Sequence, residues 1–149
     1  MCGKFKYSGK ATVLTVKPKK EGKTDQAVIA VDVGLMISTV ASDLDFFDEK
    51  LSAFFFKEDG TVRNKMMSPV SFLNKLGDYR LEILGGVHHG ATLKNFALTP
   101  LDGFGVSATF KMSFYPLGDV ITRLTEFLKE EIPIALVPSD MEFQFGEAA

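Results

Sequence analysis

Residues 106–115 read VSATFKMSFY and alternate between apolar and polar side chains without a fault. A period of two places successive side chains on opposite faces of a strand. One face therefore carries Val106, Ala108, Phe110, Met112 and Phe114, and the other carries Ser107, Thr109, Lys111, Ser113 and Tyr115. With the strand candidate at 92–99 and the turn sequence LDGFG at 101–105, the pattern predicts an antiparallel hairpin with one buried face.

A helix is predicted directly after this hairpin. Pro116 ends the strand, and residues 117–131 read LGDVITRLTEFLKEE, with apolar residues at helical spacing. The apolar stripe consists of Leu117, Val120, Ile121, Leu124, Phe127 and Leu128. Such a stripe is typical of a helix that covers a sheet, and IPIALVP at 132–138 predicts one more strand. We therefore expect a C-terminal amphipathic helix packed on an antiparallel sheet.

The N-terminal half predicts two long strands that form a hairpin. The first covers 4–17, with a bend or bulge near Gly9, and the second covers 27–37, where Val31, Val33, Leu35 and Ile37 share one face. Between them, PKKEGKTD at 18–25 predicts a loop.

The middle of the chain has weaker patterns. A short helix is predicted near residues 43–52 with Asp43 as its cap, then a strand at 54–56 and a turn at KEDG, residues 57–60. Residues 64–72 predict irregular structure, 79–84 alternate again, and GGVHHG at 85–90 predicts a loose connection. The fold class that follows is α+β, mainly antiparallel β-sheet, in a single domain over residues 1–149.

Composition limits the classes of protein to consider. The chain has 149 residues, of which 46% are hydrophobic and 24% charged, so it is long enough to bury its own core. Its one cysteine, Cys2, allows neither an internal disulfide nor a thiolate metal cluster. We find neither a signal-peptide pattern nor a membrane-spanning stretch, and we expect a cytoplasmic location.

Charge is unevenly distributed along the chain. Residues 1–23 contain seven lysines and one glutamate, whereas the rest is acidic, and the formal net charge is −2. The basic segment interleaves lysines with aromatic residues, which is what a sheet that contacts phosphates and stacks on bases requires. The candidate nucleic-acid-binding residues are Lys4, Phe5, Lys6, Tyr7, Lys10, Lys17, Lys19 and Lys20. The alternative is a solvated edge strand whose lysines prevent aggregation.

Patterns for other chemistry are weak. His88 and His89 are adjacent, so in an extended segment they point to opposite sides, which argues against one metal site. The carboxylates at Asp43, Asp45, Asp48 and Glu49 lack calcium-loop spacing, and the glycines at 85, 86 and 90 match no nucleotide-binding motif. We therefore expect no enzymatic activity, metal or cofactor.

Four segments together carry a resemblance to a known group. They are LDFFDEKL at 44–51, KEDGTVR at 57–63, TLKNFALTPLDGFGVSATFKMSF at 92–114 and LTEFLKEEIPIALVP at 124–138. In this order they resemble a group of small uncharacterised bacteriophage and prophage proteins over residues 44–138. The resemblance implies a phage or prophage origin and an accessory role in the host cytoplasm. It implies no active site, and it does not include the basic segment.

Two hypotheses about function remain open. The first is a non-enzymatic phage accessory protein that binds single-stranded DNA through the basic N-terminal strands. The second is a protein-binding module, such as an inhibitor of a host-defence protein, that uses an acidic surface. A structural virion protein ranks below both. Exposed strand edges also lead us to expect self-association into a homodimer.

Overall fold

The computed structural model describes residues 5–21, 28–40, 47, 50–73, 75–116 and 119–139, and the side chains of Lys20, Glu21 and Val28 are left out of this description. Most of the described residues lie in long strands. In chain order the elements are β1 (Tyr7–Glu21), β2 (Val28–Val40), α1 (Leu51–Phe55), β3 (Val70–Phe72), β4 (Leu76–Ile83), β5 (Gly86–Leu101), β6 (Gly105–Phe114), α2 (Val120–Glu126) and β7 (Glu131–Pro138).

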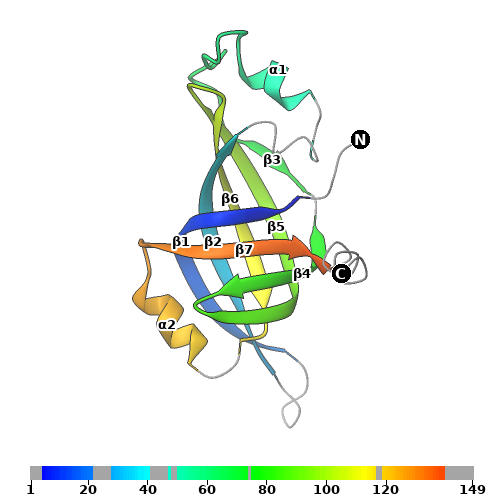
Figure 1. Cartoon of the computed structure of the whole chain (residues 1–149), viewed down its shortest axis with the longest axis vertical. Coiled ribbons are helices and arrows are strands. Elements are labelled where there is room, and N and C mark those ends of the chain that lie inside the picture. The colour runs from blue at the N-terminus through cyan, green and yellow to red at the C-terminus, as the bar shows by residue number, and fades with distance from the viewer. Residues whose placement is uncertain are drawn as a thin grey trace, which may run out of the picture.

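The described strands form one antiparallel sheet that closes on itself. The order is β3-β5-β4-β7-β1-β2-β6, and an additional pairing of β5 with β6 completes a closed barrel, with β3 attached to β5 outside the ring. In Figure 1, β7 and the first half of β1 cross in front of β2, β6 and β5. The barrel is therefore flattened into two crossing layers, with the core between them. The prediction of a mainly antiparallel β protein is confirmed.

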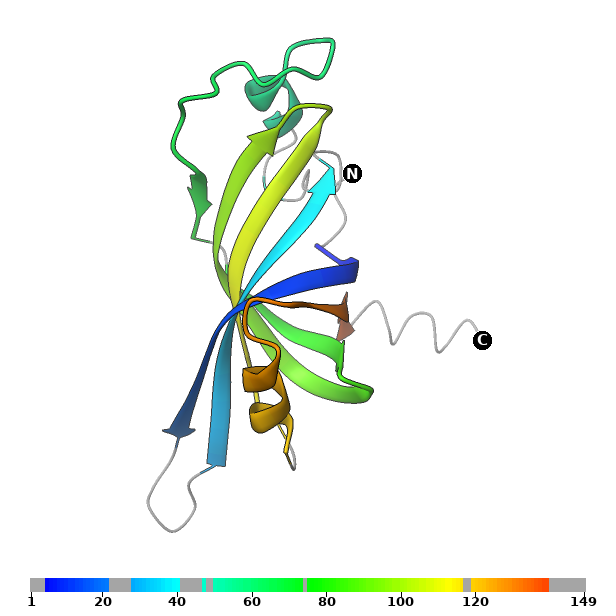
Figure 2. The ribbon, with the colours of Figure 1, turned by 90° about the vertical axis from the view of Figure 1, so that its left-hand side faces the viewer.

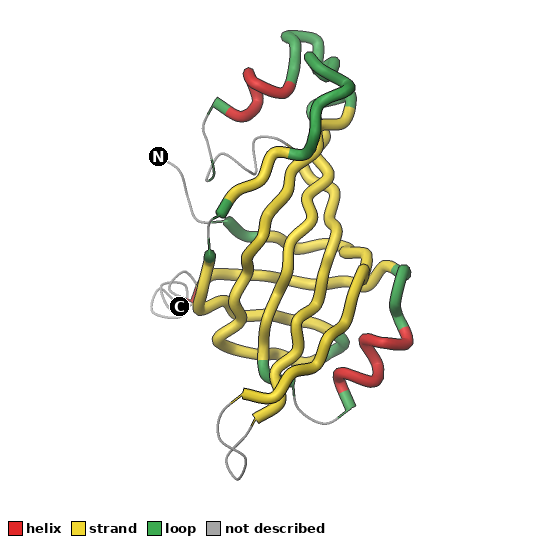
Figure 3. Tube along the Cα trace, turned by 180° about the vertical axis from the view of Figure 1, so that it is seen from behind, coloured by secondary structure: helices red, strands yellow, loops and turns green. Residues whose placement is uncertain are grey.

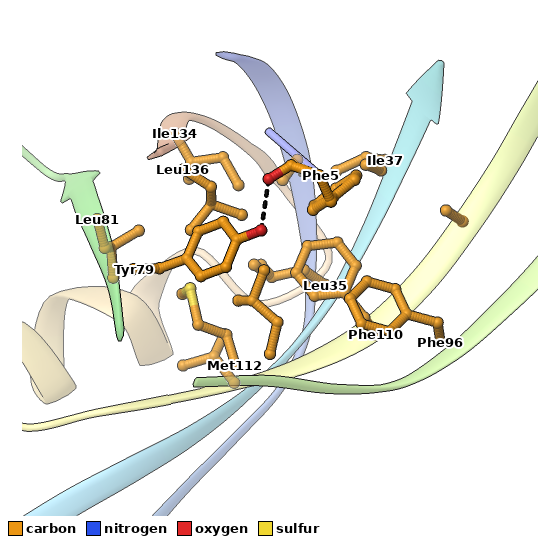
Figure 4. Close-up of a cluster of buried hydrophobic side chains, with 14 of the residues drawn as sticks. Phe5, Leu35, Ile37, Tyr79, Leu81, Phe96, Phe110, Met112, Ile134 and Leu136 are labelled. Carbon is orange, nitrogen blue, oxygen red and sulfur yellow. Dashed lines mark hydrogen bonds between the residues drawn. The ribbon is translucent and has the colours of Figure 1, made fainter. Parts of the chain in front are cut away.

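The core is apolar and rich in phenylalanine. Val106, Ala108, Phe110, Met112 and Phe114, the predicted inner face of β6, are all at most 2% exposed. Val31, Val33, Leu35 and Ile37 of β2 are equally buried. Figure 4 shows the centre of this cluster, where the buried Tyr79 hydroxyl donates a hydrogen bond to the carbonyl oxygen of Phe5. This bond ties the start of the described chain to β4 across the barrel.

The strand β1 is longer than predicted, and its irregularity lies elsewhere. It continues through residues 18–21, where a loop was expected, because Lys17 to Glu21 stay in register with β2. Beyond Thr12, β1 pairs along its length with β2 alone among the described strands, so Pro18, which lacks an N–H group, can be accommodated. The register shift falls between Val13 and Thr15, not near Gly9.

Two hairpins lie in the C-terminal half of the chain, β4–β5 and β5–β6. The sequence predicted the second correctly but not the turn of the first. The β5–β6 hairpin and the strand at 132–138 are confirmed. The loose connection predicted at 85–90 is wrong, because Gly86 already belongs to β5. The turn consists of Leu84 and Gly85 alone, with φ values of 50° and 79°. Two consecutive positive φ values match a tight type I′ hairpin turn.

The helical predictions need correction. The described helix α1 begins after Lys50, so residues 54 and 55, predicted as strand, are helical, and only Phe56 bridges to Val62. Asp43 and most of the helix predicted at 43–52 lie outside the described residues. The turn at 57–60 is present, with the Gly60 amide 2.9 Å from the Lys57 carbonyl oxygen. Within 64–72, Val70–Phe72 form β3 and the preceding residues are irregular.

The C-terminal helix is shorter than its apolar pattern suggested. It ends at Glu126 because residues 129 and 130 bond to β1 at the irregularity: the Lys129 amide donates to the Val13 carbonyl at 2.7 Å, and the Val13 amide donates to the Glu130 carbonyl at 3.0 Å. Leu124 is the one fully buried residue of the described helix. Figure 2 shows α2 beside the barrel and α1 beyond the ends of β5 and β6. No helix in the described ranges is both long and apolar enough to cross a membrane.

Candidate nucleic-acid interface

The structure buries one of the two predicted aromatic residues, Phe5, completely and the other, Tyr7, in part. Phe5 is 2% exposed and packs against Phe96 and Phe110, with ring centroids 5.7 and 6.2 Å away. Phe5 therefore offers no ring face to a base, and its assignment as a stacking residue is corrected. Tyr7 is half-buried, and its hydroxyl donates to the Lys10 carbonyl oxygen at 2.6 Å. Burial, followed by the charge of Glu131, raises the pKa of Tyr7.

The predicted lysines divide between the two layers of the barrel. Lys6 and Lys10 are exposed on the first half of β1, which pairs with β7. Lys17 and Lys19 are exposed on the second half, which pairs with β2. The irregularity between Val13 and Thr15 shifts the phase of the strand, so even-numbered residues point outward before it and odd-numbered residues after it. Lys4 lies outside the described residues, and the side chain of Lys20 is not described.

The second pair of lysines belongs to a larger basic surface. Register across β1, β2, β6 and β5 places Lys17, Asp32, Ser113 and Thr92 in one row, and Thr15, Gly34, Lys111 and Lys94 in the next. We call this outward surface, with Lys17, Lys19, Lys94 and Lys111, the lysine face. Strands are spaced by about 4.8 Å, so its first row spans roughly 14 Å. Figure 3 shows the layer of β2, β6 and β5 from this outer side.

One carboxylate, Asp32, lies among the described side chains of the lysine face. Its Oδ1 atom is 3.4 Å from Lys19 Nζ and accepts a hydrogen bond from Ser113 Oγ at 2.5 Å. Burial favours the neutral form of Asp32, but the Ser113 hydrogen bond and the charges of Lys19 and Lys94 outweigh it, so the pKa of Asp32 is lowered. The surface therefore keeps an excess of positive charge around an ionised and satisfied carboxylate.

Replacing Asp32 by asparagine tests this local electrostatic arrangement. Because its pKa is lower in the folded protein than the ordinary 3.8, ionised Asp32 stabilises the fold above that pH, and the contribution disappears as the pH falls through the folded-state pKa. We expect Asp32→Asn to lower the free energy of unfolding at pH 7 by up to about 1 kcal/mol. Urea denaturation at pH 7 and pH 3 measures the loss in free energy of unfolding. Replacement of the exposed Glu126 of α2 by glutamine is the control. An equal loss at both pH values would contradict it.

A pocket opens at one end of the lysine face. Its lining includes Lys19 from β1, Lys94 and Thr92 from β5, Ser113 from β6, and Tyr115 and Lys75 from adjoining segments, around about 240 Å³. Tyr115 is 50% exposed. The pocket therefore combines three ammonium groups, the Thr92 hydroxyl, which can donate a hydrogen bond, and the half-exposed ring of Tyr115.

The two histidines occupy a strand, where a loop was expected. His88 packs its ring 4.9 Å from that of Phe114, and its Nε2 atom is buried without a hydrogen-bond partner, while His89 is exposed. Burial, and then the charge of His89, lower the pKa of His88. The described residues contain no group of three or more side chains arranged to hold a metal ion.

Comparison of the chain with protein-family models, with curated proteins and with solved structures gives no match. The resemblance to phage proteins therefore stays a prediction.

Sequence reasoning missed half of the lysine face. Lys111 and Tyr115 were placed correctly on the outer side of the 106–115 strand, but nothing in the sequence connected them to Lys17 or Lys94. That connection depends on the pairing of β6 with both β2 and β5. The available signal was the polar face of residues 106–115, which carries a lysine, hydroxyls and a tyrosine without a carboxylate.

Proposed function

We propose that this protein binds single-stranded nucleic acid through the lysine face, as a non-enzymatic accessory protein of phage or prophage origin. The observation that carries the proposal is the convergence of Lys17, Lys19, Lys94 and Lys111 on one outward surface from three strands. Lysines contribute most of the sequence-independent affinity for phosphates by releasing condensed counterions. The one described carboxylate of the surface is already engaged by Lys19 and Ser113.

A single strand fits this surface better than a duplex does. Non-specific single-strand binders combine a basic track for the backbone with aromatic rings on which bases stack. Tyr115, half exposed at the end of the track, supplies such a ring. The net charge of −2 gives no general attraction to nucleic acid, so binding depends on the local field of the lysine face. In this proposal the C-terminal helix α2, which ends at Glu126, packs against the barrel through Leu124 as support.

Salt dependence of binding tests the proposal. We expect a fluorescently labelled single-stranded oligonucleotide to bind the protein at about 50 mM salt and to lose roughly 50-fold in affinity at about 200 mM. The estimate assumes four phosphate contacts and a slope of about −0.7 per contact for single strands. Fluorescence anisotropy over this salt range measures it. Absence of binding at the lower salt concentration, with folding verified by circular dichroism, would exclude the proposal.

The second candidate function is a protein-binding module. It draws on the end of the molecule near α1, where Glu58 and Asp59 are exposed in the turn at 57–60 and Phe54 and Phe104 are 59% and 40% exposed. Exposed rings rimmed by charge are typical of protein-interaction sites. If this candidate is right, the protein should have no affinity for the oligonucleotide. It should specifically retain a host protein, and Phe54→Ala should weaken that retention.

A further inference from the structure

The pocket at the end of the lysine face differs from the rest of that surface in its density of positive charge. Lys19, Lys75 and Lys94 line one concavity of about 240 Å³, together with Thr92 and Ser113. No carboxylate is found among the described residues of its lining. Asp32, which does not line the pocket, lies 3.4 Å from Lys19 Nζ and accepts a hydrogen bond from Ser113 Oγ. Three ammonium groups, of which Lys19 is paired with Asp32, leave this small space with an excess positive charge of about two, which favours an occupant with more than one negative charge.

We infer that this pocket binds a terminal phosphomonoester, the phosphorylated end of a nucleic-acid strand. The inference rests on the proposed function and specifies which part of the ligand the pocket takes. An internal phosphodiester carries one negative charge, whereas a phosphomonoester carries about −1.5 to −2 at neutral pH and has three strong acceptor oxygens. Those oxygens match the ammonium donors of Lys19, Lys75 and Lys94 and the hydroxyl of Thr92, whereas the Ser113 hydroxyl donates to Asp32.

The surroundings of the pocket suit a strand end. Tyr115 lines the same space and is half exposed, so the terminal base can stack on its ring. Gly90 lies at the rim with a φ of 75°, and a Cβ atom built there would meet no other atom within 4 Å. The entrance is therefore open on that side. The adjoining lysine face then contacts the following phosphates of the same nucleic-acid chain.

The experiment compares oligonucleotides of one sequence that carry a 5′-phosphate, a 3′-phosphate or hydroxyls at both ends. We expect one phosphorylated form to bind about tenfold more tightly than the unphosphorylated form, as one or two charge-assisted hydrogen bonds allow. The preference should shrink below pH about 6, where the monoester takes up its second proton. A free nucleoside monophosphate and inorganic phosphate, titrated separately, distinguish a strand end from a small phosphorylated ligand.

Two matched double variants locate the effect. Lys75→Met with Lys94→Met removes two pocket lysines, and Lys17→Met with Lys111→Met removes two lysines of the same surface that do not line the pocket. None of the four lysines is buried, so both variants should fold. We expect the pocket variant to lose the preference for the phosphorylated end. The other variant should weaken binding of all oligonucleotides by similar factors and keep the preference.

The outcomes separate the inference from the proposed function. Salt-sensitive binding with equal affinity for phosphorylated and unphosphorylated ends would overturn the inference and leave the proposed function standing. A nucleoside monophosphate that binds and depends on Lys75 and Lys94, without any oligonucleotide binding, would support the phosphomonoester pocket and overturn the strand-binding function. If none of the ligands binds, both fail.

Discussion

Phe96→Ala is expected to lower the free energy of unfolding by about 3–5 kcal/mol, the range for truncating a buried phenylalanine. Phe96 is 1% exposed, and its ring lies between those of Phe47 and Phe110, with centroids 4.8 and 5.3 Å away. Phe5 meets the same ring edge-on at 5.7 Å. The substitution therefore leaves a cavity where three distant parts of the chain meet, at Phe5, Phe47 and the β5–β6 hairpin, and the barrel around it cannot collapse easily.

Chemical denaturation in urea, followed by far-ultraviolet circular dichroism, measures this loss. Phe54→Ala is the matched control, because Phe54 is 59% exposed and the same truncation there should cost less than about 1 kcal/mol. Phe96→Leu should fall between the two, since leucine fills part of the cavity. Equal effects of Phe96→Ala and Phe54→Ala would show that the aromatic cluster does not hold the barrel together.

The elements that sequence reasoning predicted well are those buried on one face. Alternation over residues 106–115 and 27–37 defined the inner faces of β6 and β2 correctly, because a half-buried strand must separate apolar from polar residues. The errors lie where hydrogen bonding between distant segments decides the structure. Pro18 and the following lysines resemble a loop by composition, yet pairing with β2 keeps them extended. The helix α2 ends early because backbone groups of residues 129 and 130 bond to β1.

The candidate site shows the same limit. The lysines near the N-terminus could be recognised from the sequence. In the structure Lys17 and Lys19 remain candidate binding residues, whereas Phe5 is buried in the core. Conversely, Lys94 and Lys111 looked like ordinary outward residues of a hairpin. Only the closure of the sheet brings them beside β1, since β6 pairs with β5 on one side and β2 on the other. A surface assembled from strands distant in the chain has no sequence motif of its own.

Neutralising the four residues of the lysine face is expected to abolish most of the binding to single-stranded nucleic acid. The variant combines Lys17→Gln, Lys19→Gln, Lys94→Gln and Lys111→Gln. If each lysine contacts one phosphate, the slope of log affinity against log salt should become less negative by about 2.8, which is four times the single-strand value of about 0.7. At about 50 mM salt the affinity itself should fall by at least 100-fold, and anisotropy titrations at several salt concentrations measure both quantities.

A control with the same net charge makes this result specific to the surface. Lys6, Lys10, Lys57 and Lys129 are exposed but lie off the lysine face, and their replacement by glutamine removes the same four charges. If only general attraction matters, the two variants should lose affinity equally, because long-range fields depend on the total charge. If the lysine face contacts the strand, the control should keep nearly the wild-type slope, since distant charges are screened beyond roughly 10 Å at 0.1 M salt. If the control variant loses more affinity than the lysine-face variant, the interface lies instead on the first half of β1, which carries Lys6 and Lys10.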